Sequence, residues 1–454
     1  MKTMIITALL LAALPVCAQY QRITAYAEKD SALYKVNEPI KFFVSFIDVP
    51  EKKYKDPLPG NYKMIPGVKI DWVITGDGGY KKSGTIESVD KPVVIEAALP
   101  RPGFVLLNLT IKEDGNKKFQ RSAGAGVEPE KIKSGTKDPA DFDEFWAKQI
   151  ARLHARKPEI TVKDITTETE KKSVSVYDIR ITDGIVNATG ILTVPTNACP
   201  GKLPAIISFG GASWIGSSPA VKLAVSMNAL VFRMNHHDTK NIVTKEEIPE
   251  IRRRPGIGGY YIKNAFDLDK YIPITIFLRI VRSLDYLKSR PEWNGKVLVA
   301  TGPSFGGALS IVATALDPQV TLCLPGGPAM CDHLGHLNNQ IEGWPHLLKR
   351  HKYKSDQALF DKIVKVSPYY DCANFARRIK CDTTFSVGFI DLTCPPTSVY
   401  AAYNNVPAAN KKIINGPTAV HGAAFRLGEP SAFSAVNDPC LAQACHKCDI
   451  LVKP

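Results

Sequence analysis

Short strand-like runs of apolar residues dominate the first part of the chain. Residues 40–47, 68–74 and 104–111 are rich in β-branched and aromatic residues, and breaks that contain glycine or proline separate them. The glycine-rich stretch at residues 76–79 is typical of a tight turn. We therefore predict an all-β, immunoglobulin-like sandwich domain over residues 19–127. Its residues lack catalytic spacing, so packing against a second domain is favoured over glycan binding.

The pattern changes after a charged segment at residues 128–138, which is typical of a linker. An amphipathic helix is predicted next, over residues 141–150, with Trp146 in the core. After about Lys163, apolar strands alternate with helices, which predicts a mostly parallel sheet with helices on both faces, in an α/β domain over residues 128–454. The clearest strands are 204–209, 229–234, 297–301, 319–324, 383–390 and 412–414, and a long helix is expected at 274–287.

The motif G-x-S-x-G occurs at residues 302–306, between one of these strands and a run of small residues suited to a helix. This placement predicts a nucleophile elbow, a strained turn that exposes a reactive Ser304 above the sheet. The two glycines of the motif permit close backbone approach. A plain glycine-rich turn is the alternative for the motif alone, but the flanking elements favour the catalytic interpretation.

A serine hydroxyl needs a base and an orienting acid, which in this type of fold follow it in the order Ser, Asp/Glu, His. Of nine histidines, His351, His421 and His446 lie well beyond the motif, and His421 alone follows a strand in a loop rich in glycine and proline. Asp391 comes directly after the predicted strand 383–390. Taken singly, Asp391 is equally well explained as a helix cap or turn residue, and His421 as a surface loop residue. Their order and placement together predict the catalytic triad Ser304, Asp391 and His421.

Acyl transfer also needs two N–H groups that stabilise the negatively charged oxygen of the intermediate. The residue after the nucleophile, Phe305, supplies one, and Gly211 in an earlier strand-to-helix loop is the candidate for the other. A simple turn explains the pair Gly210-Gly211 nearly as well. The predicted chemistry requires no metal and no other cofactor.

The N-terminus carries a charged start, a short apolar core and the small-x-small sequence Val16-Cys17-Ala18. These features predict a secretory signal peptide over residues 1–18, and hence an exported, periplasmic or secreted protein. Lipid anchoring through Cys17 is less favoured, because valine is a poor residue directly before a lipidated cysteine. No later run reaches the ~20 apolar residues that a membrane span needs.

Cysteine content and charge bear on metal binding, disulfide formation and the choice of binding partner. Cys440, Cys445 and Cys448 surround His446, which permits a zinc site, although a local disulfide is favoured in an oxidising compartment. Removal of Cys17 with the signal would leave nine of the ten cysteines. The formal net charge of +14 could attract acidic glycans, but the Lys and Arg residues are spread along the chain and no nucleic-acid-binding module is found.

Four segments together resemble the acetyl xylan esterase/cephalosporin-C deacetylase family of α/β-hydrolases. They are residues 141–146, 302–307, 328–333 and 391–404 (DLTCPPTSVYAAYN). The resemblance covers about residues 139–427 and implies deacetylation of O-acetylated sugars, with Ser304, Asp391 and His421 as the triad.

Three positions depart from the family's usual pattern. Phe305 replaces a glutamine, residues 233–238 replace an Arg-Gly-Gln motif, and Gly422 replaces the glutamate after the catalytic histidine. The specific glycan and the oligomeric state therefore stay open. We expect the Phe305 side chain to lie at the mouth of the pocket, where a sugar ring could stack on it. The alternative is inward packing of this ring as part of the core.

The leading hypothesis is an exported serine esterase that deacetylates plant-type oligosaccharides or polysaccharides through an acyl-enzyme. One alternative keeps the triad but acts on a feruloyl or other aryl ester, or on a peptide. A second is a non-catalytic glycan-binding protein with a decayed hydrolase domain. That second alternative requires the triad residues to lie too far apart for hydrogen bonding.

Overall fold

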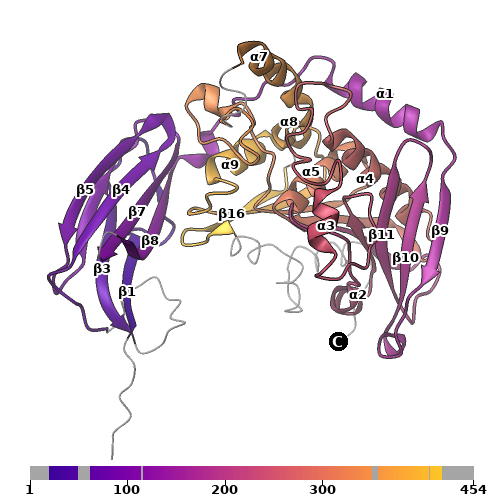
Figure 1. Ribbon diagram of the computed structural model, residues 1–454, viewed down its shortest axis with the longest axis horizontal. Coiled ribbons are helices and arrows are strands. Elements are labelled where there is room, and N and C mark those ends of the chain that lie inside the picture. The colour runs from indigo at the N-terminus through magenta and orange to yellow at the C-terminus, as the bar shows by residue number, and fades with distance from the viewer. Residues whose placement is uncertain (1–19, 50–61, 114–115, 350–355, 408, 422–454) are drawn as a thin grey trace, which may run out of the picture.

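The computed structural model describes residues 20–49, 62–113, 116–349, 356–407 and 409–421. Its N-terminal part consists of two β-sheets, which we call the N-terminal sheets (Figure 1). The first contains, in spatial order, β1 (Tyr20–Ala27), β3 (Ile40–Val49) and β6 (Val93–Ala97). The second contains β2 (Leu33–Tyr34), β8 (Asn116–Val127), β7 (Gly103–Glu113), β4 (Lys69–Gly76) and β5 (Lys81–Glu87). The three strand-like runs predicted here fall in β3, β4 and β7.

Strand β7 shows how the N-terminal sheets divide their residues between two faces. Val105, Leu107 and Leu109 are buried in a core to which both sheets contribute. Phe104 and Leu106 alternate with them and therefore lie on the other face of the strand. That second face is turned toward the rest of the chain, where the Phe104 ring packs on other aromatic rings.

The second part of the chain is built on a nine-stranded sheet, which we call the main sheet. Its spatial order is β17-β16-β15-β14-β12-β13-β11-β10-β9. The bounds are β9 (Glu159–Asp164), β10 (Val174–Thr182), β11 (Asn187–Pro195), β12 (Leu203–Phe209), β13 (Leu230–Asn235), β14 (Trp293–Pro303), β15 (Leu322–Gly326), β16 (Asp382–Gly388) and β17 (Lys411–Gly416). Strands β17, β16, β15, β14, β12 and β13 run parallel to one another. β11, β10 and β9 each pair antiparallel with their neighbours. The mostly parallel sheet is thus confirmed, but the simple alternation expected after Lys163 is wrong for its first strands.

Helices cover both faces of the main sheet, as predicted. The described helices are α1 (Phe142–His154), α2 (Val221–Met227), α3 (Ile248–Arg253), α4 (Pro273–Lys288), α5 (Phe305–Leu316), α7 (Gln357–Val366), α8 (Cys372–Ala376) and α9 (Pro396–Asn405). On one face, α4 and α5 bury apolar residues against Ile207 and Leu298. On the opposite face, α2 packs Leu223 and Ala224 against the alternate sheet residue Ile206. Trp146 of α1 is buried, as expected.

The outer face of the N-terminal sheets lies directly against the loop after β16. The Phe104 ring is 5.0 Å from that of Phe389 and 5.6 Å from that of Tyr400, measured between centroids. On the neighbouring strand, a Cβ at Gly124 would collide with the backbone carbonyl of Phe389. Glycine is needed at this position because the two backbones approach so closely.

Asp77 forms a second link between the two parts of the chain. The sequence predicts only a turn residue here, but its buried carboxylate accepts hydrogen bonds from the backbone N–H groups of Phe104 (2.8 Å) and Ile341 (2.7 Å). Thr397 donates its hydroxyl to the same group at 2.6 Å. Burial raises the pKa of Asp77 above its usual value despite these bonds.

The charged segment 128–138 is held against the second part of the chain. The Asn404 side-chain amide donates to the carbonyl oxygens of Pro129 (2.9 Å) and Ile132 (2.8 Å). Across the described residues, no helix is both long and apolar enough to cross a membrane. The predicted signal peptide with Cys17, and the cysteine cluster at residues 440–448, lie outside the described residues.

Candidate active site

Ser304 lies at the turn between β14 and α5, as predicted. Its backbone angles, φ 57° and ψ −117°, are rare for a residue with a side chain and indicate local strain. A Cβ at Gly302 or Gly306 would collide with the carbonyl oxygen of Phe209, at the end of neighbouring β12. The two glycines therefore allow the turn to pack tightly, which places Ser304 at the carboxyl edge of the main sheet.

His421 lies between Ser304 and Asp391. Its Nε2 atom is 3.1 Å from Ser304 Oγ, and its Nδ1 atom is 2.8 Å from Asp391 Oδ2. The three side chains follow β14, β16 and β17, whose carboxyl ends meet at one edge of the sheet. The structure thus brings together the three residues that the sequence analysis selected. A hydroxyl, an imidazole and a carboxylate in this order can transfer a proton away from the hydroxyl.

The Asp391 carboxylate is buried and its two oxygens have separate partners. Oδ1 accepts hydrogen bonds from the backbone N–H groups of Thr393 (2.8 Å) and Cys394 (2.9 Å), which leaves Oδ2 facing His421. This arrangement fixes the orientation of the carboxylate. The decayed-hydrolase alternative requires a separated triad, and the observed distances do not meet that condition.

The two predicted N–H donors lie on either side of Ser304. Phe305 is the first residue of α5, where backbone N–H groups have no acceptor within the helix. A Cβ built on Gly211 would lie 3.9 Å from the Cβ of Ser304, so this loop passes directly beside the serine. Both residues are therefore positioned near the reacting hydroxyl, and their role as an oxyanion hole belongs to the proposal below.

The expected position of the Phe305 side chain at the pocket mouth is wrong. The ring is 0 % exposed and packs in an aromatic cluster against His236, Tyr260 and Trp344, at centroid distances of 5.3, 5.2 and 5.9 Å. The ring therefore fills the layer between α5 and the loops that carry these three residues. Tertiary packing, which the sequence motif does not encode, decides this orientation.

Two neighbouring histidines lie in the segment 233–238. His236 and His237 are both buried after β13, with ring centroids 4.3 Å apart. Burial lowers the pKa of His236 well below its usual value and that of His237 to about 3, with a further contribution from Arg279. Both rings are therefore neutral at physiological pH and form part of the aromatic wall behind Ser304.

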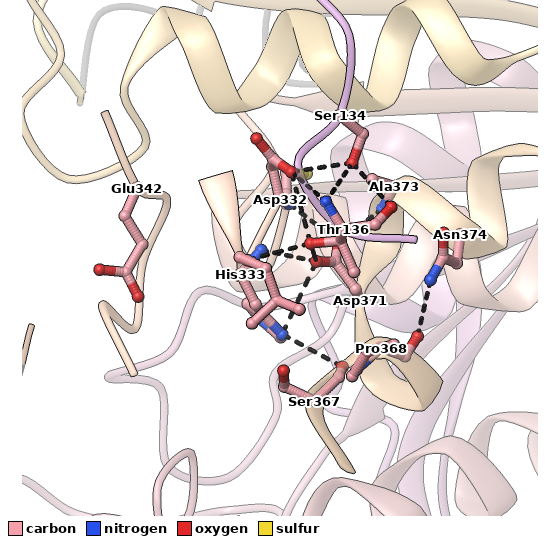
Figure 2. Close-up of polar contacts among 12 residues, drawn as sticks. Ser134, Thr136, Asp332, His333, Glu342, Ser367, Pro368, Asp371, Ala373 and Asn374 are labelled. Carbon is pink, nitrogen blue, oxygen red and sulfur yellow. Dashed lines mark hydrogen bonds and ion pairs between the residues drawn. The ribbon is translucent and has the colours of Figure 1, made fainter. Parts of the chain in front are cut away.

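A buried polar network fixes the loop after β15, and Figure 2 shows its members converging on two carboxylates. Asp332 accepts from the Thr136 backbone N–H at 3.0 Å, while Asp371 accepts from the Thr136 hydroxyl at 2.6 Å and from the Asp332 N–H at 2.8 Å. Burial and the neighbouring Asp371 raise the pKa of Asp332 to about 6. In the same loop, Ala329 donates its N–H to the Ser304 carbonyl at 2.9 Å. The network therefore supports the backbone that carries the serine.

Trp214 is a site residue that the sequence analysis did not identify. Its side chain is 47 % exposed, although it contacts the backbone at Gly210 next to the serine. The ring is therefore accessible from solvent and lies close to the loop that passes beside Ser304. Its position three residues after Gly211, in the same predicted loop, was the available signal.

Asp391, Cys394 and His421 each place one possible metal-binding atom within 4.8 Å of the others. Burial raises the pKa of the Cys394 thiol well above its usual value, which disfavours the thiolate that a metal would require. Asp391 and His421 also contact each other. That the chemistry requires no metal stays a prediction.

Comparison with known proteins places these observations in a family context. The family model described as acetyl xylan esterase (AXE1) matches residues 128–424. The acetyl esterase Axe7A of Xylanibacter ruminicola is 31% identical over 391 residues, which cover 84% of this chain and 83% of that protein.

Two solved structures share the fold. An acetyl xylan esterase from a Paenibacillus species has a TM-score of 0.58 and 24% identity, covering 68% of this chain and 96% of its own. Acetyl xylan esterase 1 from a Thermoanaerobacterium species has a TM-score of 0.57 and 23% identity, covering 70% and 98%. The second part of the chain therefore has the α/β-hydrolase fold.

Proposed function

The chain belongs to the acetyl xylan esterase family and is a carboxylic-ester hydrolase, and on that basis we propose that it removes acetyl groups from O-acetylated, xylan-type carbohydrates through Ser304, His421 and Asp391. The observation that carries this proposal is the continuous contact from Ser304 Oγ through the His421 ring to Asp391 Oδ2. A bound metal or organic cofactor has no part in the proposed reaction.

In the first half-reaction, Ser304 Oγ attacks the carbonyl carbon of the acetyl group while His421 Nε2 accepts the hydroxyl proton. Asp391 holds the ring and stabilises the imidazolium that forms. The carbonyl oxygen becomes negatively charged and accepts hydrogen bonds from the N–H groups of Gly211 and Phe305. The carbon–oxygen bond to the sugar then breaks, and the sugar oxygen takes the proton from His421.

In the second half-reaction, water attacks the acetyl-enzyme. His421 accepts a proton from this water, and the second tetrahedral intermediate releases acetate when the bond to Ser304 Oγ breaks. The serine regains its proton from His421. Each step returns the site to its starting protonation, so the cycle balances.

Two observations support a carbohydrate as the alcohol part of the ester. Trp214 presents an exposed ring face beside Ser304, and pyranose rings stack on such faces through their C–H groups. A Cβ added at Gly211 would make no contact shorter than 3.9 Å, so the loop beside the serine is not tightly packed at this point. Acetate release from acetylated xylo-oligosaccharides, measured beside feruloyl and peptide substrates, tests this choice. Hydrolysis of feruloyl esters alone would favour the aryl-ester alternative.

The proposal includes export and two domains. Residues 1–18 act as a signal peptide, residues 19–127 form an immunoglobulin-like sandwich domain, and residues 128–454 form the esterase domain. The two N-terminal sheets with a shared core support the sandwich assignment. Mass spectrometry of the protein after expression in its source tests the cleavage, with a mature chain that begins at Gln19 as the expected result.

A further inference from the structure

A cavity of about 420 Å³ lies where the N-terminal sheets meet the second part of the chain. Residues 104–106 of β7 form one wall. Phe389, Leu392 and Pro395, from the loops around the end of β16, form the other. The cavity is therefore shared between two parts of the chain that lie far apart in the sequence.

The cavity walls combine an apolar surface with an accessible mouth. Phe104 and Phe389 are buried within the interface, and their rings contact each other at 5.0 Å. Leu392, in contrast, is 67 % exposed and Leu106 is half-buried, so a ligand can reach the space between them. A volume of this size with mainly apolar walls is typical of binding sites for small organic ligands.

Glu342 provides an unusual polar group in this wall. It is 0 % exposed, and its Oε1 atom accepts a hydrogen bond from the Leu348 N–H at 3.0 Å. Its Oε2 atom is buried and has no hydrogen-bond partner among the described residues. Figure 2 shows Glu342 apart from the network of Asp332 and Asp371. A buried carboxyl oxygen without a partner is costly, and a ligand hydroxyl would satisfy it.

The cavity is next to the catalytic centre but distinct from it. Asp391 lines the cavity. Ser304 and His421 are not among the described residues that line it. A ligand in the cavity would therefore lie behind the orienting acid and not at the scissile ester. Two acidic side chains, Glu342 and Asp391, face the cavity, with Lys349 also in its wall. Burial raises the pKa of Glu342 to about 7, and the Asp391 carboxylate already contacts His421, so the wall holds no strong unpaired charge that would select an ion, which favours an uncharged ligand.

We propose that this cavity binds one uncharged sugar unit of the glycan, with its C–H faces against Phe389 and Leu392 and one hydroxyl donating to Glu342 Oε2. The inference rests on the proposed function for the identity of the glycan. It assigns a binding role to the N-terminal sheets, because β7 supplies one wall. The catalytic centre and the cavity then hold different units of the same glycan chain.

Calorimetric titration of the full chain with unacetylated xylotriose tests the site. Leu106→Trp fills the cavity from β7, and Thr110→Trp is its matched control, because Thr110 lies on the same face of the same strand but not in the cavity wall. We expect Leu106→Trp to weaken the affinity for xylotriose by about tenfold or more, or to remove one of two binding events. Thr110→Trp should change the affinity by less than about twofold. Equal effects of the two variants would overturn the proposal.

Glu342→Gln is the second variant. Glutamine keeps an acceptor for the Leu348 N–H but presents an amide NH₂ at the position of Oε2, which cannot accept a hydroxyl proton. Weaker xylotriose binding with an unchanged melting temperature is expected, and unchanged affinity would contradict the role of Glu342. Binding of methyl ferulate in place of xylotriose would overturn the sugar assignment.

Acetate release is measured on the same preparations with acetylated xylo-oligosaccharides. Deacetylation without xylotriose binding at the cavity would overturn this inference alone. Cavity binding without esterase activity would overturn the proposed function alone.

Discussion

The ring of Phe305 packs edge-on against the ring of His236, with centroids 5.3 Å apart and an interplanar angle of 73°. Phe305, the residue after Ser304, therefore contributes its side chain to the core, whereas its backbone N–H lies next to the proposed nucleophile. This separation of roles leads to the first prediction.

Phe305→Gln should destabilise the fold by about 3 kcal/mol, because it places an amide in an apolar aromatic cluster and leaves part of the ring's volume empty. Thermal unfolding measures the loss, and Phe305→Leu, with an expected cost of about 1–2 kcal/mol, is the apolar control. Activity at low temperature should fall similarly on every ester. A changed preference among sugars at constant melting temperature would show that the ring contacts substrate.

Ser304→Ala should lower kcat by about 10⁴-fold or more, because the nucleophile is lost while the fold is kept. The matched control is Ser310→Ala, since Ser310 lies on the helix that follows Ser304, is buried and donates its hydroxyl to the Gly306 carbonyl. That control should retain activity. Near-native esterase activity in Ser304→Ala, measured by acetate release, would refute the assignment of the nucleophile.

Trp214→Ala should raise KM for acetylated xylo-oligosaccharides by about tenfold, which corresponds to ~1.4 kcal/mol of lost stacking. The effect on kcat should be smaller, because the ring binds the sugar and not the reacting carbonyl. Trp214→Phe should restore most of the affinity. Equal KM values for the alanine variant and the wild type would exclude the stacking role.

His237 should make the fold less stable as the pH falls. The pKa of the buried ring is lowered to about 3, so between its usual value near 6.5 and that value the unfolded chain binds a proton that the folded chain does not. Stability is therefore complete above about pH 6.5 and decreases below it, by ~2 kcal/mol at pH 5 for this residue. Denaturant unfolding of wild type and His237→Phe at pH 7, 6 and 5 should show a shallower decline for the variant. Parallel declines would contradict the prediction.

Asp77→Ala should destabilise the chain by about 3 kcal/mol, because it leaves the buried N–H groups of Phe104 and Ile341 without an acceptor. Asp71→Ala is the control, since Asp71 bonds Thr85 and Lys112 at the surface and its loss should cost less than about 1 kcal/mol. Chemical unfolding compares the two variants. Similar losses would show that Asp77 does not stabilise the junction.

The sequence was most informative where apolar patterning acts over short distances. The predicted strand at residues 204–209 differs by one residue from β12, and the long helix at 274–287 lies within α4. β9 was not predicted, although Ile160 and Val162 alternate with polar residues; the run is short, and all of its residues are exposed. The chain order of serine, acid and histidine, together with their placement after predicted strands, selected three side chains that the fold brings within hydrogen-bonding distance.

Features that depend on packing between distant segments could not be predicted. The sequence around Asp77 indicates only a turn. Its carboxylate is buried as a hydrogen-bond acceptor because Ile341 and Thr397, which lie far away in the sequence, donate to it. The inward orientation of Phe305 depends on His236 and Trp344 in the same way. Neither orientation has a local sequence signal.

The partners of Asp77 also set an order of events during synthesis. The ribosome produces Ile341 264 residues later and Thr397 320 residues later than this carboxylate, which lies in the first domain to emerge. The nascent N-terminal sheets can build their own core early, yet the surface around Asp77 stays hydrated until almost the whole polypeptide has been translated. Completion of that junction therefore requires a nearly full-length chain, and a chain truncated before residue 397 lacks the hydroxyl of Thr397, one of the donors to this carboxylate.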